Sequence, residues 1–201
     1  MTDMKTGLFG GTFNPIHIAH LVIAEWVRSE LDLDRIYFMP TAQSPMKVSD
    51  PSTGDMEHRI RMVELAIKGN DKFRLSDYES EPGKVYYSVD TVRRASEDLG
   101  LSKDRLFFII GEDNFEIVPT KWKNPEKLAS LCTIVVARRF GNRNKDNTAS
   151  EFEHIFVDTP VIDISSSMIR ERIRSGLSIR YLLPPDVEQY IIDNNLYTEN
   201  G

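Results

Sequence analysis

The sequence predicts an α/β protein: a doubly wound parallel sheet with a small helical part at the C-terminal end. Short apolar runs alternate with segments whose apolar residues recur at helical spacing, which is typical of parallel strands covered by helices on both faces. Small residues follow three of the strands, where ligands of such sheets bind. The length of 201 residues suits one domain. We therefore expect a single domain over residues 1–201, with a helical part over about 165–201.

The predicted strands are short, apolar and closed by turn residues or small polar ones. They cover residues 5–10, 35–39, 73–77, 105–110, 133–137 and 161–164. Pro40 stops the second strand, and Gly111 follows the fourth. The last strand is expected to end at Ile164 and Ser165. Together with the glycines after the first strand, these ends are where we expect the chemistry.

The predicted helices lie between and after the strands. They cover residues 18–31, 56–68, 88–99, 125–131, 166–175 and 186–194. Ser88 is the expected N-cap of the third helix, with Asp90 in its first turn, and Gly176 closes the fifth. Polar stretches at 41–55 and 140–152 are expected loops. The first is long for a compact domain, which favours a functional role.

The composition excludes several classes of protein. A net charge of −6 argues against a protein that coats nucleic acid, because such proteins present a basic face. The single cysteine, Cys132, lies in an apolar run and is expected in the core. Neither a signal-peptide pattern nor a membrane span is recognisable. We therefore expect a cytoplasmic protein without nucleic-acid or membrane partners, and the sequence leaves open a homo-oligomer.

The segment GLFGGTFNPIHIAH, after the first strand, predicts a phosphate-binding turn. Gly10 and Gly11 let backbone approach an anion closely, and the following helix points free N–H groups at the same place. His17 and His20 share one helix face near that N-terminus. An alternative is a plain strand–turn–helix with two incidental histidines. A zinc site is disfavoured because no third ligand stands at a telling spacing.

The segment ISSSMIRERI predicts a second anion site at a helix start. Ser165, Ser166 and Ser167 supply hydroxyls and N–H groups there, with Arg170 one turn further on. A capped helix with a solvated basic face is the alternative interpretation. The patterns GxxxxGK[ST] and GxGxxG are absent after the strands, which argues against P-loop enzymes and standard dinucleotide dehydrogenases.

The two segments resemble the (H/T)xGH and ISSTxIR signatures of the nucleotidylyltransferase superfamily, in the same order and at a similar distance. Within it, the chain most resembles the bacterial nicotinate-nucleotide adenylyltransferase (NadD) family. The pieces that carry this resemblance are SPMK at 44–47, RIRMVELAI at 59–67, VYYSVDTV at 85–92, IIGEDNF at 109–115, VVARRFG at 135–141 and the tail LLPPDVEQYIIDNNLY. The resemblance implies a Rossmann-like fold that moves AMP from ATP to nicotinate mononucleotide, with Mg²⁺ accompanying ATP.

The resemblance also implies roles for individual residues. The catalytic group is His17, His20, Lys47 and Arg170. The ATP-binding group is Gly10, Gly11, Thr12, Phe13, Gly111, Asp113, Arg139, Ile164, Ser165, Ser166 and Ser167. The group expected to bind the second substrate is Asn14, Lys47, Tyr87, Ser88 and Trp122. His20 would contact the α-phosphate, Asp113 the ribose, and Trp122 the pyridine ring. Few protein ligands to the metal are expected, and no residue is singled out as one.

The chain departs from the family pattern at a few positions. Ala19 replaces a glycine of the first signature, Asn14 a common aspartate, and Ser167 a threonine. Lys123 follows Trp122 where the family often has tyrosine, and we hypothesise that this lysine pairs with the carboxylate of nicotinate. The alternatives are a nicotinamide-mononucleotide or phosphopantetheine adenylyltransferase and a non-catalytic nucleotide sensor on the same fold. Loss of either histidine would favour the sensor, and both are present.

Overall fold

The computed structural model describes residues 4–41, 55–81, 84–115, 122–140 and 152–198. Lys47 and most of the two expected loops lie outside these ranges. Within them, six strands form one sheet in the order β3-β2-β1-β4-β5-β6, with every neighbouring pair parallel. The strands are β1 (Thr6–Gly11), β2 (Arg35–Pro40), β3 (Phe73–Leu75), β4 (Leu106–Gly111), β5 (Thr133–Arg139) and β6 (His154–Thr159). The strand order reverses between β1 and β4, so the expected ligand crevice lies at their carboxyl ends.

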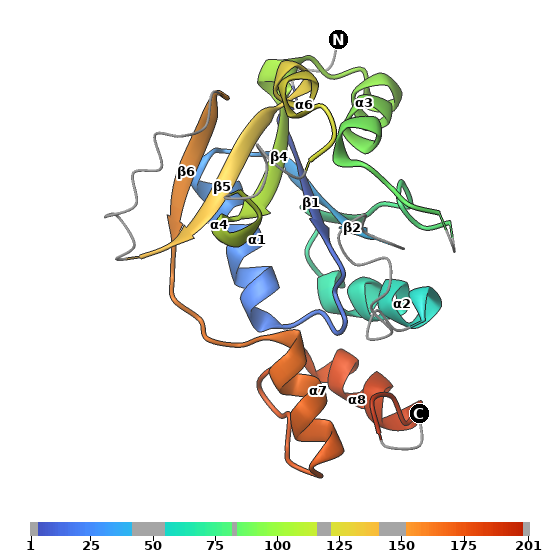
Figure 1. The fold of residues 1–201 in the computed structure, drawn as a ribbon. Helices are drawn as coiled ribbons and strands as arrows, with labels where there is room; N and C mark the ends of the chain where they lie inside the picture. The colour runs from blue at the N-terminus through green and yellow to red at the C-terminus, as the bar shows by residue number, and fades with distance from the viewer. Residues whose placement is uncertain (1–3, 42–54, 82–83, 116–121, 141–151, 199–201) are drawn as a thin grey trace.

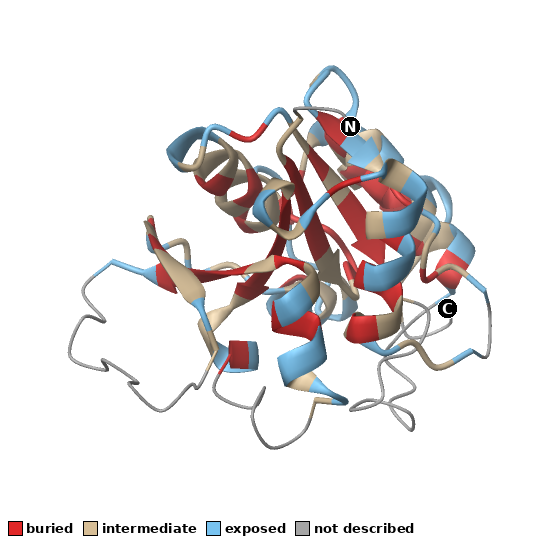
Figure 2. Ribbon diagram, turned by 90° about the horizontal axis from the view of Figure 1, so that it is seen from above, coloured by how far each residue is buried: buried red, intermediate tan, exposed pale blue. Residues whose placement is uncertain are grey.

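Helices cover both faces of this sheet (Figure 2). They are α1 (Ile18–Glu30), α2 (Met56–Ile67), α3 (Ser88–Leu99), α4 (Glu112–Phe115), α6 (Pro125–Leu131), α7 (Ser166–Arg174) and α8 (Pro185–Asp193), with a 3₁₀ turn η2 (Lys103–Arg105). One buried cluster joins the sheet to α1, α2, α7 and α8, and the other joins it to α3 and α6. The predicted doubly wound parallel sheet is confirmed.

Alternating side chains of the central strands feed the two clusters. Phe9 and Phe107 pack on the side of α1 and α2, whereas Leu8 and Phe108 pack on the side of α3 and α6. Both sides are apolar because successive residues of a strand point to opposite faces and both faces are covered. Cys132 is fully buried in the second cluster, and burial raises the pKa of its thiol to about 12. The cysteine is therefore an inert core residue.

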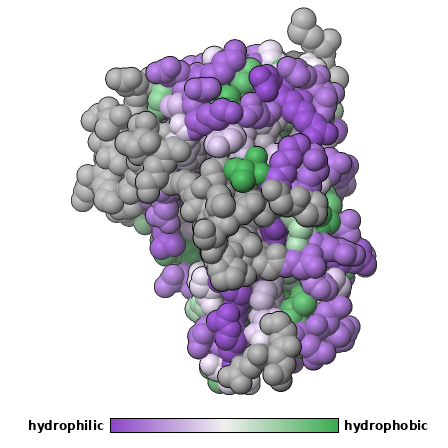
Figure 3. Space-filling model, turned by 45° about the vertical axis from the view of Figure 1, so that its right-hand side comes forward, coloured by the Kyte–Doolittle hydropathy of each residue, from purple (hydrophilic) through white to green (hydrophobic). Residues whose placement is uncertain are grey.

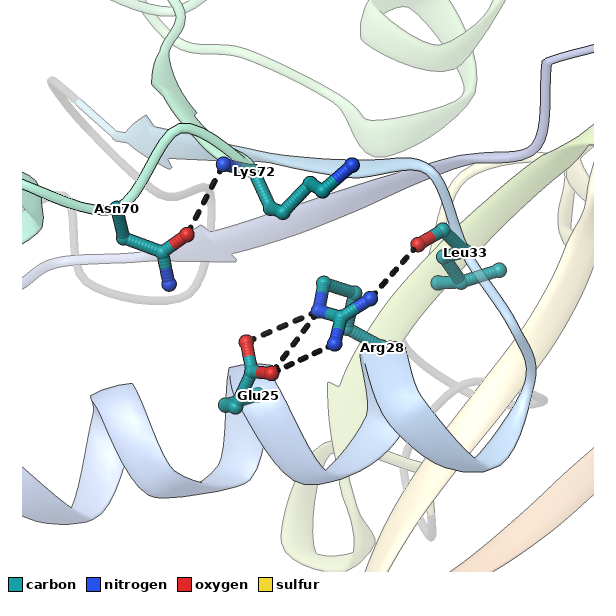
Figure 4. A network of polar contacts seen from close by, with 5 residues as sticks. All are labelled: Glu25, Arg28, Leu33, Asn70 and Lys72. Atoms are coloured by element: carbon teal, nitrogen blue, oxygen red, sulfur yellow. Dashed lines mark hydrogen bonds and ion pairs between the residues drawn. The ribbon is translucent and has the colours of Figure 1, made fainter.

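The C-terminal end of α1 carries a network of polar contacts (Figure 4). Glu25 accepts hydrogen bonds from Arg28, with the shortest N···O distance 2.7 Å, and Arg28 also donates to the carbonyl oxygen of Leu33 at 3.3 Å. The carbonyl belongs to the connection into β2, so Arg28 ties the helix end to the next strand. Because the Glu25 side chain is about half exposed, we expect the ion pair itself to contribute no more than about 1 kcal/mol.

The helices α7 and α8 lie beyond the carboxyl ends of the strands (Figure 1). The N–H of Ile18, the first residue of α1, donates to the carbonyl oxygen of Leu182 in the segment between them at 3.0 Å. Ile169, Val187 and Ile191 are buried in the cluster that holds α1 and α2. This part of the chain is therefore packed onto the predicted active edge. On the face seen in Figure 3, hydrophilic residues predominate and hydrophobic ones form small patches.

The structure corrects several predicted elements. The last strand is β6, not 161–164: β6 forms the ladder with β5, whereas Val161 is 57% exposed in an extended connection. Pro160 separates two apolar runs of similar appearance, and only pairing with β5 distinguishes them. Helix α3 begins at Ser88, so Tyr87 is the N-cap. The short elements η2 and α4 were not predicted, and the remaining bounds agree within two residues.

Candidate active site

The turn after β1 is shaped by Phe13 rather than by an open space above the glycines. Phe13 has a φ of 48°, in the left-handed region, and its ring is 2% exposed against Phe9 and Phe38. A Cβ on Gly11 would lie 2.9 Å from two atoms of this ring, whereas one on Gly10 would meet only Met39, at 3.8 Å. Gly11 thus makes room for the buried ring of Phe13.

The two histidines form a stacked pair at the start of α1. His17 is the N-cap of the helix, and its ring centroid lies 3.7 Å from that of His20. The backbone N–H of His17 donates to Nδ1 of His20 at 3.2 Å. Since Nδ1 accepts, the proton of a neutral His20 must be on Nε2. His20 therefore offers an Nε2–H donor, and the edge-on ring of Phe13, 5.1 Å away between centroids, fixes its orientation.

Both imidazoles are neutral at neutral pH. Burial lowers the pKa of His17 from 6.5 to about 4. Burial, together with the charge of His17, holds the pKa of His20 well below its usual value. The Nδ1 atom of His17 is buried and finds no hydrogen-bond partner among the described residues. The pair can donate hydrogen bonds to an anion without carrying charge, and a bound polyphosphate would raise both pKa values.

Helix α7 binds the turn after β1 directly, although the two segments are far apart in sequence. The hydroxyl of Ser166 donates to the carbonyl oxygen of Pro15 at 2.9 Å. Nη1 of Arg170 donates to the carbonyl oxygen of Asn14 at 2.7 Å, and Nη2 lies 3.5 Å from the Ser167 hydroxyl. The two predicted anion-binding segments are thus adjacent. Ser166 uses its hydroxyl and Arg170 uses both terminal nitrogens on the protein, Nη2 only at 3.5 Å. The first N–H groups of a helix have no partner within the helix, so those of α7 can bind a ligand.

The N-terminus of α7 is capped within its own first turn. The hydroxyl of Ser165 accepts a hydrogen bond from the N–H of Met168 at 3.2 Å. Ser165 and Ser167 are exposed, and Ile164 is half-buried. The hydroxyl of Ser165 therefore serves the helix, while its neighbours line the open side.

Two residues that hold the same turn were missed from the sequence. Nη1 of Arg59, on α2, donates to the carbonyl oxygens of Thr12 and Thr41 at 2.8 Å each. The Tyr197 hydroxyl donates to Oδ1 of Asn14 at 2.5 Å, and burial raises the pKa of this tyrosine. The signal for Arg59 was its position in the buried stripe of α2, between Met56 and Met62, where an arginine needs a specific polar partner. Nothing local in the sequence marked Tyr197.

The end of β4, beside β1, is more open. Gly111 is half-buried, and a Cβ there would meet no atom within 4 Å. Asp113 follows in α4 with its side chain exposed. Arg139 is the exposed last residue of β5. These three predicted residues lie on neighbouring strand ends of the same edge, with room for a ligand above the backbone.

The residues predicted to bind the pyridine ring gather at the start of α3. The ring of Trp122 meets Phe108 edge-on, 6.0 Å between centroids, and its Nε1 finds no partner among the described residues. Tyr87 is 38% exposed, and Ser88 begins the helix. Nζ of Lys123 lies 4.4 Å from the centroid of the Tyr87 ring. It also lies 3.2 Å from a carboxylate oxygen of Asp90, so this lysine already has a partner on the protein.

No group of three or more histidine, cysteine, aspartate or glutamate side chains suited to a metal occurs in the described part of the chain. The close stacking of His17 and His20 comes from their ring faces, not from nitrogens converging on one point. A zinc site at this pair is therefore not supported by a third ligand. Among the helices described, none is long and apolar enough to cross a membrane.

The fold and this edge of the sheet define an α/β protein of the nucleotidyltransferase class: a neutral histidine pair and two helix N-termini meet where the strand order reverses. A family model described as cytidylyltransferase-like matches residues 8–172. A probable nicotinate-nucleotide adenylyltransferase of Borreliella burgdorferi is 39% identical over 98% of each chain. One from Bacillus pumilus is also 39% identical, over 96% of this chain and 98% of its own.

The solved structures show the same fold at lower identity. The nicotinic acid mononucleotide adenylyltransferase of Plasmodium falciparum, complexed with NaAD, has a TM-score of 0.77 and 20% identity, over 96% of this chain and 97% of its own. The same enzyme complexed with APC has a TM-score of 0.76. On the strength of its curated relatives, the chain belongs to the nicotinate-nucleotide adenylyltransferase family.

Proposed function

We propose that the protein transfers AMP from ATP to nicotinate mononucleotide, releasing pyrophosphate and forming deamido-NAD, a step of NAD biosynthesis. The observation that carries this proposal is the contact between α7 and the His17–His20 turn, in a chain of this family. An adenylyl transfer needs the α-phosphate of ATP and the departing β- and γ-phosphates to be held at adjacent sites. The reaction is an in-line displacement without a covalent intermediate.

The reaction requires that the two substrates are aligned and that developing charge is stabilised, but it does not require a general base. The nucleophile is a phosphate oxygen of nicotinate mononucleotide, already ionised because the second pKa of such a phosphate is about 6. It attacks the α-phosphorus of ATP, and the bond to the pyrophosphate oxygen breaks. No proton has to be removed from the nucleophile, so a neutral donor at the α-phosphate suffices. This agrees with the low pKa values of the histidines.

We assign the transition-state contact to Nε2–H of His20, and the contact to the neighbouring phosphates to His17. Arg170, the second nitrogen of which is not committed to Asn14, and the N–H groups of Ser166 and Ser167 would hold the β- and γ-phosphates. Lys47, which lies outside the described residues, is proposed as a further charge clamp. The other predicted ATP-binding and substrate-binding residues keep the roles that the family resemblance gives them.

Nucleotidyltransferases of this family generally need a divalent metal, and we propose that the metal is Mg²⁺ bound to ATP. Magnesium neutralises phosphate charge and orients the leaving group. The donors at this edge are imidazole, guanidinium and N–H groups, which suit phosphate oxygens rather than a hard cation. The ion would therefore be held by the phosphates of the substrate, and enter with ATP.

We also propose that residues 1–201 form one domain, in which residues 165–201 are a helical part rather than a separate unit. Support comes from the shared buried cluster and from the bond between Tyr197 and Asn14. We propose the cytoplasm as the place of action, since the only cysteine is a buried thiol that needs no oxidising compartment.

The test is pyrophosphate release with Mg-ATP and, separately, nicotinate mononucleotide, nicotinamide mononucleotide and phosphopantetheine. Release with the first alone is expected. Equal release with nicotinamide mononucleotide would support adenylyl transfer but contradict a preference for nicotinate mononucleotide. If folded protein that still binds ATP releases no pyrophosphate with any of the three substrates, the result would contradict the proposal and favour a nucleotide sensor. The hypothesis on Lys123 is tested in the same assay: Lys123→Ala should reduce the preference for the acid, with Lys127→Ala on α6 as the matched control.

A further inference from the structure

Two almost fully buried charged side chains have no assigned contact with substrate, and Thr41 lies between them. Arg59 is 1% exposed and Glu79 is 6% exposed. Arg59 donates to the carbonyl oxygen of Thr41 at 2.8 Å, and the Thr41 side chain lies beside the Glu79 carboxyl group, where it opposes the rise in pKa that burial causes. Oγ1 of Thr91 donates to Oε1 of Glu79 at 2.7 Å. Arg59, Thr41, Glu79 and Thr91 are called the buried polar chain below.

The two ends of the buried polar chain reach the two halves of the proposed site. At one end, Arg59 holds the carbonyl oxygen of Thr12 at 2.8 Å. In a trans peptide the N–H of the next residue points the opposite way, so this bond also directs the N–H of Phe13 away from Arg59. At the other end, Thr91 lies in the first turn of α3, and its Oγ1 is 3.4 Å from the carbonyl oxygen of Tyr87.

The central element is the end of β2. The N–H of Thr41 donates to the carbonyl oxygen of Gly11 at 3.0 Å, while its own carbonyl oxygen accepts from Arg59. Thr41 is thus bonded to the turn after β1 through its backbone, and its side chain is a neighbour of Glu79. Polar contacts therefore lead from the histidine-bearing turn to the helix that begins the proposed pyridine pocket.

We propose that the buried polar chain is a positioning device, which fixes the separation between the turn after β1 and the start of α3. The inference rests on the proposed function, in which these two segments carry ATP and nicotinate mononucleotide. Arg59, Glu79 and Thr91 are positioning residues, because they act through the turn and the helix and are not assigned a contact with substrate.

Two physical arguments support a role beyond stability. Buried charges are costly, and well-packed apolar residues in their place are often as stabilising or more so. Buried hydrogen bonds, however, hold the groups that they join in one arrangement. An in-line transfer between two bound phosphates depends on such an arrangement, since a displacement of about 1 Å can cost on the order of 100-fold in rate.

The primary test uses Thr91, whose hydroxyl can be removed with little change in shape. In Thr91→Val we expect kcat to fall roughly tenfold, while the Kd of ATP and of nicotinate mononucleotide, each measured alone by calorimetry, change by less than about twofold. Thr91→Ser should restore most of the rate because it keeps the hydroxyl. Ser96→Ala is the control: it removes a bond of 2.8 Å from Ser96 to Leu101 at the other end of α3, and should leave kcat unchanged.

A second test asks whether the ends of the chain act together. Arg59→Lys keeps a cationic donor but cannot reproduce the guanidinium geometry, so we expect a lower kcat with nearly unchanged Kd values. The double variant with Thr91→Val should lose less than the product of the two separate losses, because both break the same chain. Glu79→Gln, which keeps the size of the side chain, replaces Arg59→Lys in the cycle if the lysine variant does not fold.

The outcomes separate this inference from the proposed function. An unchanged kcat in Thr91→Val, no rescue by serine, or fully independent losses in the double variant would overturn the positioning role while wild-type activity stands. A loss confined to the Kd of one substrate would also overturn it, since the residue would then act locally. If the wild-type protein were inactive, that result would contradict both the proposed function and this inference.

Discussion

The carboxyl ends of β1 and β4 lie side by side, and both end in glycine, but the protein holds them in different ways. The turn after β1 is fixed by donors from two other helices: Arg59 on α2, and Ser166 and Arg170 on α7, each bond one of its carbonyl oxygens. The end of β4 runs into the four-residue helix α4, with an exposed Asp113. Under the proposed function, the fixed turn carries the chemistry and the open end serves binding.

Removal of the donor at the fixed turn should have the largest effect. His20→Ala is expected to lower kcat by about 10²–10³-fold, since loss of one hydrogen-bond donor to transition-state charge costs about this much. The measurement is pyrophosphate release under saturating substrates. The control is His58→Gln on α2, which breaks the contact of 2.9 Å with the Tyr190 hydroxyl and should leave kcat within a small factor of wild type. Comparable loss in both variants would contradict the assignment.

The two glycines offer a direct comparison of the strand ends. Gly11→Ala places a Cβ 2.9 Å from the Phe13 ring, and we expect a loss of about 1–3 kcal/mol in the free energy of unfolding from overpacking. Gly111→Ala meets nothing within 4 Å and should leave stability nearly unchanged. Urea unfolding of both variants is the measurement. Equal stability of the two would mean that the turn after β1 is less tightly fixed than its contacts indicate.

The histidine pair should make stability depend on pH. The pKa of His17 is about 4 in the folded state against an ordinary 6.5, so the folded protein binds fewer protons and acid favours unfolding. The contribution is complete above pH 6.5 and declines toward pH 4; at pH 5 we expect a loss of about 2 kcal/mol from His17 alone.

The measurement is the free energy of unfolding at pH 7 and pH 5 for wild type and His17→Gln. The variant should lose less stability on acidification than wild type. Burial raises the pKa of Glu79, which opposes the trend, but both proteins contain Glu79. The difference between them therefore reports His17 together with the effect of its charge on His20. Identical pH profiles would show that His17 is not desolvated in solution.

The open end of β4 should give the smallest effect. Asp113→Asn keeps the shape of the side chain and removes its charge, so we expect a rise in KM for ATP of only about three- to tenfold, the value of one hydrogen bond. Stability should not change, because the side chain is exposed. A large fall in kcat instead would place Asp113 in the chemical step and erase the contrast between the two strand ends.

The sequence by itself determined the sheet, most helices and the residues at the two helix starts. Apolar runs, helical spacing and turn residues are local, and they record which faces are buried. The same signals failed at β6, because two apolar runs flank Pro160 and only the ladder with β5 decides between them. They also did not reveal a second reason for Gly11, which is that the ring of Phe13 occupies the space that a Cβ would fill.

Only the tertiary structure decided how the site is held. Arg59 lies in α2 and Tyr197 near the C-terminus, and each bonds a turn that is distant in sequence. The desolvation that keeps His17 neutral likewise comes from packing. Such contacts leave no period or motif in the chain, because a carbonyl oxygen is present at every residue. Which carbonyl receives a donor depends on where the fold places the helix that carries it.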